Sequence, residues 1–395
     1  MLIAGEASGD RLAAELVGAL RERVLRTESE PTDEVQPLRT QLAPHFIGAG
    51  GAHMKAAGVA LTFDLTEHSV IGVGDPVKKS LLFLRRLIEL RRLAIQQQPD
   101  AVILVDFSFF NHLFAGILRR QLRRKAGPFN NWQPKIVKYV SPQVWASRPG
   151  RAYRMAHDFD LLLSIFPFEK DWYARRVPKL RVEFVGHPMV ERLSNAERGT
   201  RNAFEKSPTV VLLPGSRADE VRRHLPVVTG AFELMRKEIP TIRGKMILPA
   251  DGLADAARSF GPPAGLEIRV SGLNDALSRA DLAISKSGTI TMECAMHGVP
   301  ALVFYKTSWP TYFIGKQIVS VPYLAMPNLL AGEPVFPEFV QGAATPENLA
   351  RAALELLRDD TRRQTVKVKL EKVVASLGGP GASARAADAI VSLLK

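Results

Sequence analysis

The chain has 395 residues, 46% of them hydrophobic and 24% charged, with a formal net charge of +13 at pH 7. This length and composition predict a globular protein of two ordinary domains and exclude a single small module. The single cysteine, Cys294, excludes an internal disulfide framework and a zinc cluster built on cysteines, and we expect it to be a small buried hydrophobe.

The sequence contains no targeting or membrane-spanning signal that we recognise. Residues 1–6 show no basic segment followed by an apolar stretch, so we expect a cytoplasmic protein without a secretory signal. The longest apolar segment, residues 101–118, carries four polar side chains and is too polar to cross a bilayer.

A first strand ends at Ala4 and leads through small residues into a helical pattern of leucines. Small residues let the backbone approach a ligand and leave N–H groups free for anions or hydroxyls, which makes Ser8 and Gly9 candidate contacts. Glu6 is unusual there, because a carboxylate repels phosphate but accepts hydrogen bonds from sugar hydroxyls. A Gly-rich turn that only starts a helix is the alternative. The Gly-rich loop 48–51 is a second candidate for a turn whose free N–H groups bind anions or hydroxyls.

Residues 77–96 predict a helix that is basic and more hydrophobic than one buried stripe requires. Such a helix is typical of a segment that rests on an anionic bilayer surface. The predicted membrane contacts are Leu81, Leu82, Leu84, Arg85 and Arg86. Packing of the helix against the sheet of its own domain is the alternative.

The most hydrophobic predicted strand, residues 101–105, is followed by Asp106. A carboxylate at the end of a buried strand is partly desolvated, which favours base chemistry, so Asp106 is a candidate acceptor for the proton of a sugar hydroxyl. A buried N-cap of the next helix is the alternative role for this residue.

Positive charge is concentrated in two segments. Residues 119–154 contain ten Lys and Arg and no Asp or Glu, and residues 78–92 contain six Lys and Arg against one Glu. Such clusters suit nucleic acid, anionic lipid or phosphorylated substrates, and charge alone does not choose among them. An ordinary solvated surface is the bland interpretation.

Asp158 and Asp160 form a short Asp-x-Asp pattern, which holds a metal and a sugar nucleotide in some transferases. The pattern is common and leads straight into the predicted strand 161–165. We therefore predict no metal site, and no residue pattern predicts a cofactor.

The predicted strand 210–213 runs into Pro-Gly-Ser-Arg, where Arg217 offers a forked donor to a diphosphate at a helix N-terminus. Pairing of Arg217 with a nearby carboxylate is the alternative. After the strand 282–284, the residues 287–289 begin another helix whose N–H groups suit a phosphate, and Glu293 lies one turn further on, within reach of a ribose. A capped helix with an internal glutamate is the alternative there.

Short runs rich in Val, Ile and Leu alternate with helical patterns, which predicts parallel strands buried on both faces. The runs are residues 101–105, 135–140, 161–165, 182–185, 210–213, 282–284 and 301–304. The predicted class is α/β, with two Rossmann-like domains whose mainly parallel sheets face a central cleft, the architecture called GT-B. We place the domains at residues 1–188 and 189–364, with a helix at about 365–395 packing back on the first domain.

Several motifs follow one another along the chain in a fixed order. They are residues 4–10 (AGEASGD), 71–72 (IG), 139–146 (YVSPQVWA), 166–170 (FPFEK), 184–188 (FVGHP), 213–217 (LPGSR), 287–289 (SGT) with Glu293, and 327–332 (PNLLAG). In these motifs the chain resembles the lipid A disaccharide synthase family over nearly its whole length. It departs from the family's usual residues at Ser108, Phe109, Ser147, Glu333 and Pro334.

The resemblance implies an inverting GT-B enzyme that works without a cofactor at the anionic cytoplasmic face of the inner membrane. Its C-terminal domain would bind UDP-2,3-diacylglucosamine and its N-terminal domain 2,3-diacylglucosamine 1-phosphate, giving the β(1→6) disaccharide 1-phosphate and UDP. By position, Asp106 matches the candidate base and Glu6 an acidic residue near the acceptor. The substrate contacts implied together with these are Ser8, Gly9, Asn111, Ser141, Trp145, Arg217, Ser287, Gly288, Thr289, Glu293, Asn328 and Gln341.

Two other functions remain open from the sequence. One is another GT-B enzyme acting on a UDP-amino sugar, and the other is a non-catalytic membrane-binding or nucleic-acid-binding relative. We predict no nucleic-acid partner, because the chain keeps Asp106, Glu6 and Arg217 together. Acyl-chain length and oligomeric state, a homodimer included, stay undecided.

Overall fold

A computed structural model describes residues 1–29, 44–66, 76–125, 127, 131–194 and 207–395. The chain divides into two compact units, unit 1 with Met1–Glu191 and Leu377–Lys395, and unit 2 with Arg192–Ser376. The division lies within α8 (Pro188–Ser194), the helix in which the sequence also places the boundary. Of the resemblance motifs, Ile71 and Gly72 lie outside the described residues.

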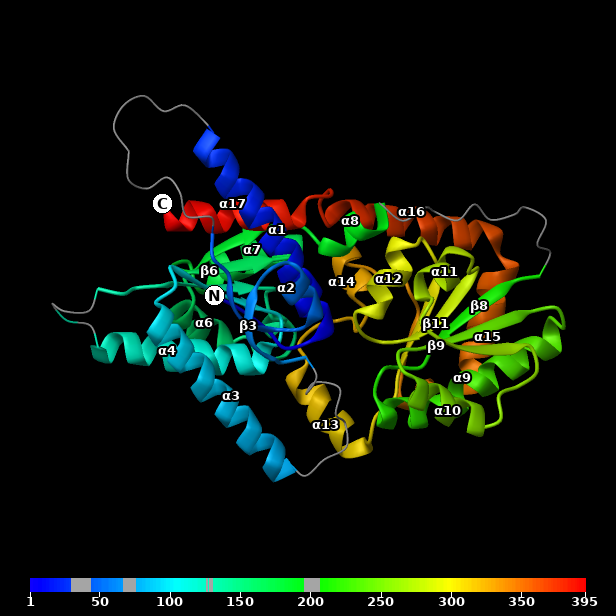
Figure 1. The fold of residues 1–395 in the computed structure, drawn as a ribbon. Helices are drawn as coiled ribbons and strands as arrows, with labels where there is room; N and C mark the ends of the chain where they lie inside the picture. The colour runs from blue at the N-terminus through cyan, green and yellow to red at the C-terminus, as the bar shows by residue number, and fades with distance from the viewer. Residues whose placement is uncertain (30–43, 67–75, 126, 128–130, 195–206) are drawn as a thin grey trace. The chain divides into compact units, whose positions relative to one another are not determined.

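Unit 1 is a parallel sheet with helices on both faces (Figure 1). Among the described residues its strands follow the order β3-β2-β1-β4-β5-β6-β7, and every pair is parallel. In chain order the elements are β1 (Leu2–Ala4), α1 (Ala7–Ser29), β2 (Ile47–Gly50), α2 (Ala52–Ala56), β3 (Ala60–Asp64), α3 (Pro76–Gln97), β4 (Ala101–Val105), α4 (Ser108–Lys125), β5 (Lys135–Tyr139), α5 (Val144–Ser147), α6 (Arg151–Asp158), β6 (Leu161–Ser164), α7 (Pro167–Arg176), β7 (Arg181–Phe184), α8 and α17 (Ala382–Leu394).

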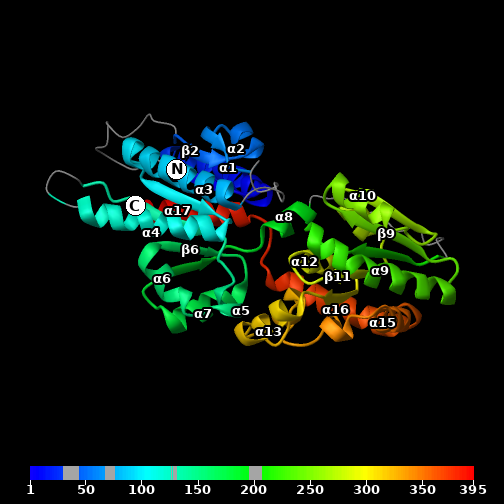
Figure 2. The same cartoon turned by 90° about the horizontal axis from the view of Figure 1, so that it is seen from below.

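Successive side chains of these strands point to opposite faces, so the sheet has two apolar cores. Ile3, Val102 and Leu104 pack with α3, α4, α6 and α7, whereas Leu2 and Ile103 pack with α1 and α17. In Figure 2, α3 and α4 are seen together on their side of unit 1.

The C-terminal segment returns to unit 1 at Leu377, and α17 packs along α1 (Figure 1). The sequence places the start of this segment at about 365. The helix before it, α16 (Asp360–Ser376), belongs to unit 2, because its buried residues Val366 and Leu370 join the core formed with α11 and α12.

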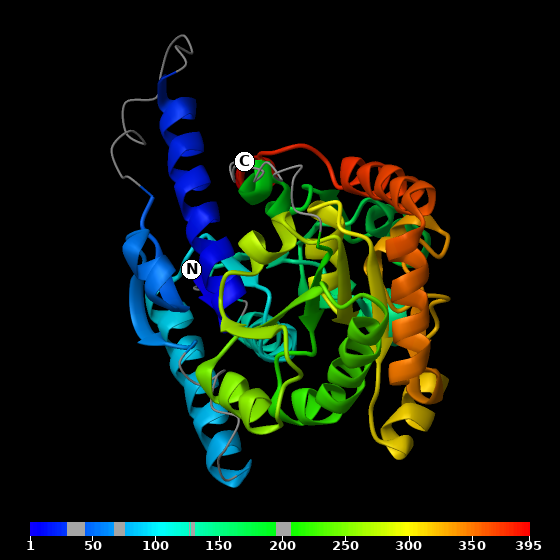
Figure 3. The ribbon, with the colours of Figure 1, turned by 90° about the vertical axis from the view of Figure 1, so that its right-hand side faces the viewer.

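Unit 2 repeats the same design, with the strand order β10-β9-β8-β11-β12-β13 among the described residues and every pair parallel. Figure 3 turns its side of the molecule toward the viewer. The elements are β8 (Thr209–Leu213), α9 (Ala218–Glu238), β9 (Arg243–Leu248), α10 (Asp251–Ser259), β10 (Leu266–Val270), α11 (Leu273–Ser278), β11 (Leu282–Lys286), α12 (Ile290–Met296), β12 (Ala301–Tyr305), α13 (Trp309–Ile318), α14 (Met326–Ala331), β13 (Glu338–Val340), the 3-10 helix η1 (Gln341–Ala343), α15 (Pro346–Arg358) and α16.

In both sheets the strand order reverses direction between the first and the fourth strand of the unit, β1 and β4 in unit 1 and β8 and β11 in unit 2. Ligands of open parallel sheets bind outside the carboxyl ends of the strands at this point. The predicted α/β class is confirmed, and the topology directs attention to four loops, those after β1, β4, β8 and β11. Within the described residues, no helix is both long and apolar enough to cross a membrane.

Candidate active site

The loops after β1 and β4 meet because the two strands are neighbours, with Ala4 paired to Val105. Ser8 Oγ donates a hydrogen bond of 3.4 Å to Asp106 Oδ2, so two of the predicted site residues are in contact. A Cβ atom at Gly9 would lie 3.2 Å from the Cβ of Asp106, which explains why a glycine stands at this close approach. Glu6 is exposed in the same turn, and its carbonyl accepts from Asp10 N at 2.8 Å.

The backbone at Asp106 has an unfavourable conformation that neighbouring side chains stabilise. Asp106 and Phe107 both have positive φ angles, 46° and 38°, which are unfavourable for residues with a Cβ atom. Asn111 Nδ2 donates to Val105 O at 3.1 Å and to Asp106 O at 2.9 Å, and Lys138 Nζ also donates to Asp106 O. Asn111 is fully buried and supports this turn through Nδ2, and its predicted place among the substrate contacts stays a prediction.

Lys138 was not predicted from the sequence as part of the site. It is fully buried on β5, and burial lowers the pKa of its ammonium group to about 8, against the opposing influence of Asp106 and Glu6. A buried lysine therefore lies next to the backbone of the candidate base. Its position among strand residues of alternating pattern gave no sequence signal, because a lysine in a strand usually faces solvent.

The backbone N–H groups at the end of the loop 48–51 and just after it are hydrogen-bonded within the chain. The Asp10 carboxylate accepts from Gly51 N at 2.7 Å, from His53 N at 2.9 Å and from Met54 N at 3.1 Å. These N–H groups at the start of α2 are therefore used within the chain, and they are not free to bind an anion or a hydroxyl as the sequence predicted for this loop.

Ser141 and Trp145 belong to a buried polar cluster around Glu169. Trp145 Nε1 donates to Glu169 Oε1 at 2.9 Å, Ser164 Oγ donates to Glu169 Oε2 at 2.8 Å, and Ser141 Oγ donates to Tyr173 Oη at 3.3 Å. Ser141 and Trp145 are both buried in the interior of unit 1, and their predicted contact with substrate stays a prediction.

Glu169 makes the stability of unit 1 depend on pH. Burial raises the pKa of its carboxyl group from 4.5 to about 7, although hydrogen bonds from Ser164 and Trp145 act in the opposite direction. The folded state therefore binds the proton more tightly than the unfolded chain, and this contribution, present below pH 4.5, is lost as the pH rises through 7.

We expect the difference in unfolding free energy between wild type and Glu169→Gln to shift by roughly 3 kcal/mol between pH 4.5 and pH 7.5 in favour of the variant. Urea unfolding of both proteins across this range measures the shift. Parallel pH profiles would show that the pKa of the Glu169 carboxyl group is the same in the folded and the unfolded protein.

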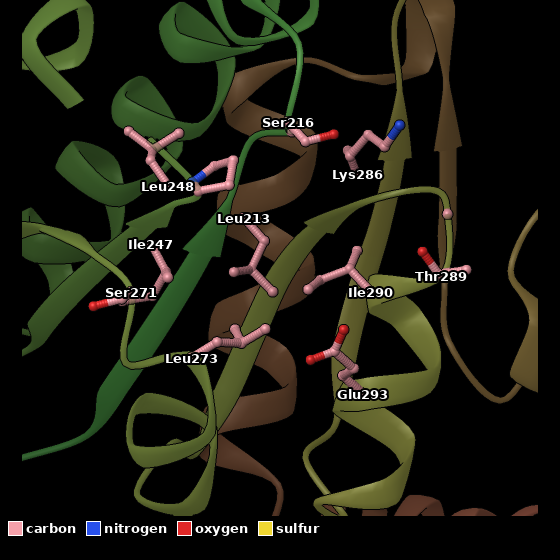
Figure 4. A pocket seen from close by; sticks show the side chains of 13 residues that line it. Leu213, Ser216, Ile247, Leu248, Ser271, Leu273, Lys286, Thr289, Ile290 and Glu293 are labelled. Atoms are coloured by element: carbon pink, nitrogen blue, oxygen red, sulfur yellow. The ribbon is translucent and has the colours of Figure 1, made fainter. Parts of the chain in front are cut away.

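In unit 2, the loops after β8 and β11 enclose a pocket of about 320 Å³. It is lined by Leu213, Gly215, Ser216, Ile247, Leu248, Pro249, Ser271, Leu273, Lys286, Gly288, Thr289, Ile290 and Glu293. Figure 4 shows Ser216 and Lys286 at one end and Glu293 at the other, with Leu213 and Ile290 between them. The predicted residues Gly288, Thr289 and Glu293 are therefore brought together.

Lys286 is the functional group of this pocket that the sequence analysis missed. Its Nζ donates to both oxygens of Glu220, at 3.1 and 3.2 Å, and its side chain also lines the pocket. Gly288 has a φ of 151°, and a Cβ atom there would lie 3.3 Å from Lys286 Cε, so the glycine leaves room for the lysine. The pattern Lys-Ser-Gly-Thr after a strand was the available signal for the lysine.

Glu293 lies on α12 with one side toward the pocket. Burial raises the pKa of its carboxyl group to about 7, with Arg192 acting in the opposite direction. A carboxyl group of this kind exchanges hydrogen bonds with sugar hydroxyls as acceptor or as donor.

Arg217 and Ser287 lie outside the lining of the pocket. The Arg217 side chain is 83% exposed and lies 3.9 Å from Glu220, the alternative pairing recognised in the sequence. Ser287 Oγ donates to Leu324 O at 3.0 Å. In this structure, Lys286 rather than Arg217 is the cation that lines the pocket.

Asn328 and Gln341 are buried and hold the chain rather than line the pocket. Asn328 Nδ2 donates to Phe336 O at 2.7 Å and to Glu338 Oε1 at 2.8 Å, while its Oδ1 accepts from Phe336 N at 2.8 Å. Gln341 bonds both backbone groups of Thr307, each at 2.8 Å. Their polar groups are all hydrogen-bonded within unit 2, and their predicted role as nucleotide contacts stays a prediction.

The Asp-x-Asp carboxylates are engaged by basic side chains. Asp160 pairs with Arg119 and accepts from Ile136 N at 2.7 Å, and Asp158 lies 2.9 Å from His157 and 3.6 Å from Arg154. No group of three or more metal-ligating side chains occurs in the part of the chain that the structure describes.

Comparison with known proteins extends over the whole chain. The profile of the family described as lipid-A-disaccharide synthetase matches residues 1–390. Proteins named lipid-A-disaccharide synthase from Syntrophus aciditrophicus and Myxococcus xanthus are each 34% identical to this chain, over 406 and 401 residues, and each comparison covers 100% of this chain and 97% of the relative.

Solved structures with low sequence identity share the fold. A UDP-GlcNAc 2-epimerase from Neisseria meningitidis bound to UDP-GlcNAc aligns with a TM-score of 0.58 at 12% identity, covering 97% of both chains. MurG from Acinetobacter baumannii aligns with a TM-score of 0.54 at 16% identity, covering 99% of this chain and 98% of that one. The fold is GT-B, and the full-length match shows that the chain belongs to the lipid-A-disaccharide synthetase family.

Proposed function

We propose that the chain joins UDP-2,3-diacylglucosamine to 2,3-diacylglucosamine 1-phosphate, giving the β(1→6) disaccharide 1-phosphate and UDP with inversion at the anomeric carbon. The observation that carries this proposal is the family match over residues 1–390. The two loop pairs at the switch points of the two sheets supply residues suited to the reaction.

The pocket of unit 2 suits the nucleotide of the donor. Its apolar floor, with Leu213 and Ile247, suits a base, and Glu293 suits ribose hydroxyls. Lys286 and the N–H groups at the start of α12 suit the diphosphate, because a cation and oriented dipoles offset the charge that develops as UDP leaves. In this proposal, protein groups alone bind the diphosphate.

The β1 and β4 loops of unit 1 suit the acceptor hydroxyl. In the proposed step, a carboxylate oxygen of Asp106 takes the proton of the 6-hydroxyl as that oxygen attacks the anomeric carbon from the face opposite UDP. The new carbon–oxygen bond forms as the bond to the β-phosphate oxygen breaks, and UDP leaves with the bonding electron pair. Glu6 and Ser8 lie in the same pair of loops, where they suit contacts with acceptor hydroxyls.

The decisive experiment offers the full-length protein both acylated substrates and measures the disaccharide 1-phosphate by mass spectrometry together with released UDP. We expect one UDP for each disaccharide. Turnover of non-acylated UDP-N-acetylglucosamine alone, without a disaccharide, would replace the proposal by an epimerase or another UDP-amino-sugar enzyme.

The first half of α3 suits contact with the anionic inner-membrane surface. Leu81 and Leu84 are 62% and 53% exposed, Leu82 is half-buried, and the Arg85 side chain is 76% exposed. Arg86 differs from the prediction: it donates to Glu89 Oε2 at 2.8 Å and stacks over Phe63, so it faces its own unit. Exposed leucines beside an exposed arginine favour a bilayer interface.

We expect Leu81→Ser combined with Leu84→Ser to reduce binding to anionic vesicles by about tenfold, because two exposed leucines lose their burial in the interface. Co-sedimentation with vesicles measures the loss. Leu25→Ser is the matched control, since Leu25 is 57% exposed on α1. Equal losses in both proteins would place the membrane contact elsewhere.

A further inference from the structure

The two basic segments of the sequence meet in unit 1, where α3 packs against α4 (Figure 2). Arg91 of α3 and Arg120 and Arg124 of α4 line a hollow of about 410 Å³, together with Ile117 and Gln121. The four α4 residues are spaced by three, one and three positions, so they share one face of the helix. We call this hollow the arginine groove.

Several basic residues near the arginine groove already have partners within unit 1. Arg85 and Arg86 of α3 pair with Glu89 at 3.0 and 2.8 Å. On α4, Arg119 pairs with Asp160, and Arg123 contacts His157 Nε2. These contacts engage four arginines near the groove, whereas the groove arginines themselves take part in none of them.

The three groove arginines differ from these neighbours. Among the described residues, no carboxylate lies within ion-pair distance of Arg91, Arg120 or Arg124. In the same part of the chain, Arg91 Nε is buried without a hydrogen-bond partner. A buried donor without an acceptor is unfavourable, and an external anion would offer Arg91 an acceptor. Arg86 Nε, outside the groove, is also buried without a hydrogen-bond partner among the residues described, so an external anion is favoured mainly by the three unpaired guanidinium groups that line one hollow.

We propose that the arginine groove binds the phosphate of a phosphate ester and that this ester is the headgroup of an anionic phospholipid. Guanidinium groups donate in forks that match phosphate oxygens, and three of them from two helices surround one anion. Ile117 gives the groove an apolar side, which suits the glycerol carbons of a lipid better than a hydrated ion.

The geometry of α3 favours a lipid over a soluble ester. Leu84 and Arg91 are separated by two turns of the same helix, about 10 Å at 1.5 Å per residue. A helix that lies along a bilayer interface contacts the acyl boundary through its leucines, while the long arginine side chains beside them reach the headgroups. We therefore treat the exposed leucines of α3 and the arginine groove as parts of one membrane-facing surface of unit 1. This step rests on the membrane contact proposed above for α3, and the binding test below does not depend on the catalytic proposal.

The experiment compares two double variants of the full-length protein. Arg91→Gln with Arg124→Gln removes two groove arginines, and Arg92→Gln with Arg123→Gln removes the same charge from the neighbouring positions on the same helices, outside the groove lining. Binding is measured by co-flotation with phosphatidylcholine vesicles that contain or lack phosphatidylglycerol. Circular dichroism and the thermal midpoint verify that both variants are folded.

We expect the groove variant to lose about tenfold in affinity for phosphatidylglycerol vesicles and the control variant about twofold or less. Equal losses in both variants mean diffuse electrostatic attraction, and no loss in either means no phosphate site. Both results overturn the proposal.

Competition with glycerol 3-phosphate distinguishes a lipid headgroup from a soluble phosphate ester as the ligand of the groove. If it does not displace the protein from vesicles at millimolar concentration, the headgroup assignment stands. Displacement of the wild type, with weaker glycerol 3-phosphate binding by the groove variant, keeps the phosphate site but assigns it to a soluble ester. Binding of a short RNA that the groove variant alone loses, with vesicle binding unchanged, overturns the lipid assignment.

Discussion

Asp106→Asn is expected to lower turnover by about two to four orders of magnitude, the range typical of a lost general base. The amide keeps the size of the side chain but cannot take the proton of the acceptor hydroxyl. The turn itself should survive, because Lys138 and Asn111 hold the backbone carbonyl of Asp106 and not its side chain. Initial rates with both acylated substrates measure the effect.

UDP affinity, measured by calorimetry, is expected to stay unchanged in the same variant, since the nucleotide pocket is built from residues of unit 2. Asp388→Asn is the matched control: this carboxylate of unit 1 lies on α17, pairs with Arg23 at 2.6 Å and is half exposed. If Asp106→Asn turns over within about threefold of the control, Asp106 is not the base.

The fold could be predicted where strands are buried on both faces. Residues 101–105 and 210–213 are continuous apolar runs, and both are central strands. β9 and β10 escaped the sequence analysis because they carry charges: Arg243–Leu248 begins with Arg-Gly-Lys, and Leu266–Val270 alternates between partly exposed and exposed residues at the sheet edge. The alternation of apolar and charged residues in Leu266–Val270 is typical of a half-buried strand, but a search for continuous apolar runs does not detect it.

The sequence predicted which loops form the candidate site. It did not predict in which direction the polar side chains of those loops point. The turns at Glu6 and Gly288 follow the strands at the two switch points, as small residues after a strand indicate. Asn111, Asn328 and Gln341 turn inward to bond backbone groups, a choice that depends on neighbours distant in sequence. The spacing of residues in the sequence does not show in which direction a side chain points. A polar residue next to a site is therefore easily predicted to contact the ligand even where it points into the protein.

Lys286→Met is expected to weaken UDP binding by about ten- to a hundredfold, because a hydrogen bond to a charged group contributes about 1.5–3 kcal/mol. Glu220→Gln is expected to do the opposite and strengthen UDP binding severalfold. Glu220 accepts two hydrogen bonds from Lys286 Nζ, so a diphosphate has to compete with this carboxylate for the ammonium group. Calorimetry with UDP measures both changes, and Lys237→Met, at an exposed lysine of α9, is the control for loss of positive charge.

The double variant Lys286→Met with Glu220→Gln separates binding from folding. Removing Lys286 alone takes the nearer of two cations from a largely buried carboxylate and leaves only the exposed Arg217 at 3.9 Å, which lowers stability whatever the ligand does. Neutralising that carboxylate restores stability. If Lys286 binds the diphosphate, the double variant recovers the unfolding free energy of the wild type but keeps the weak UDP affinity of Lys286→Met. If Lys286 only compensates Glu220, affinity recovers together with stability, and the diphosphate contact has to be assigned to Arg217 or to the backbone at Gly288.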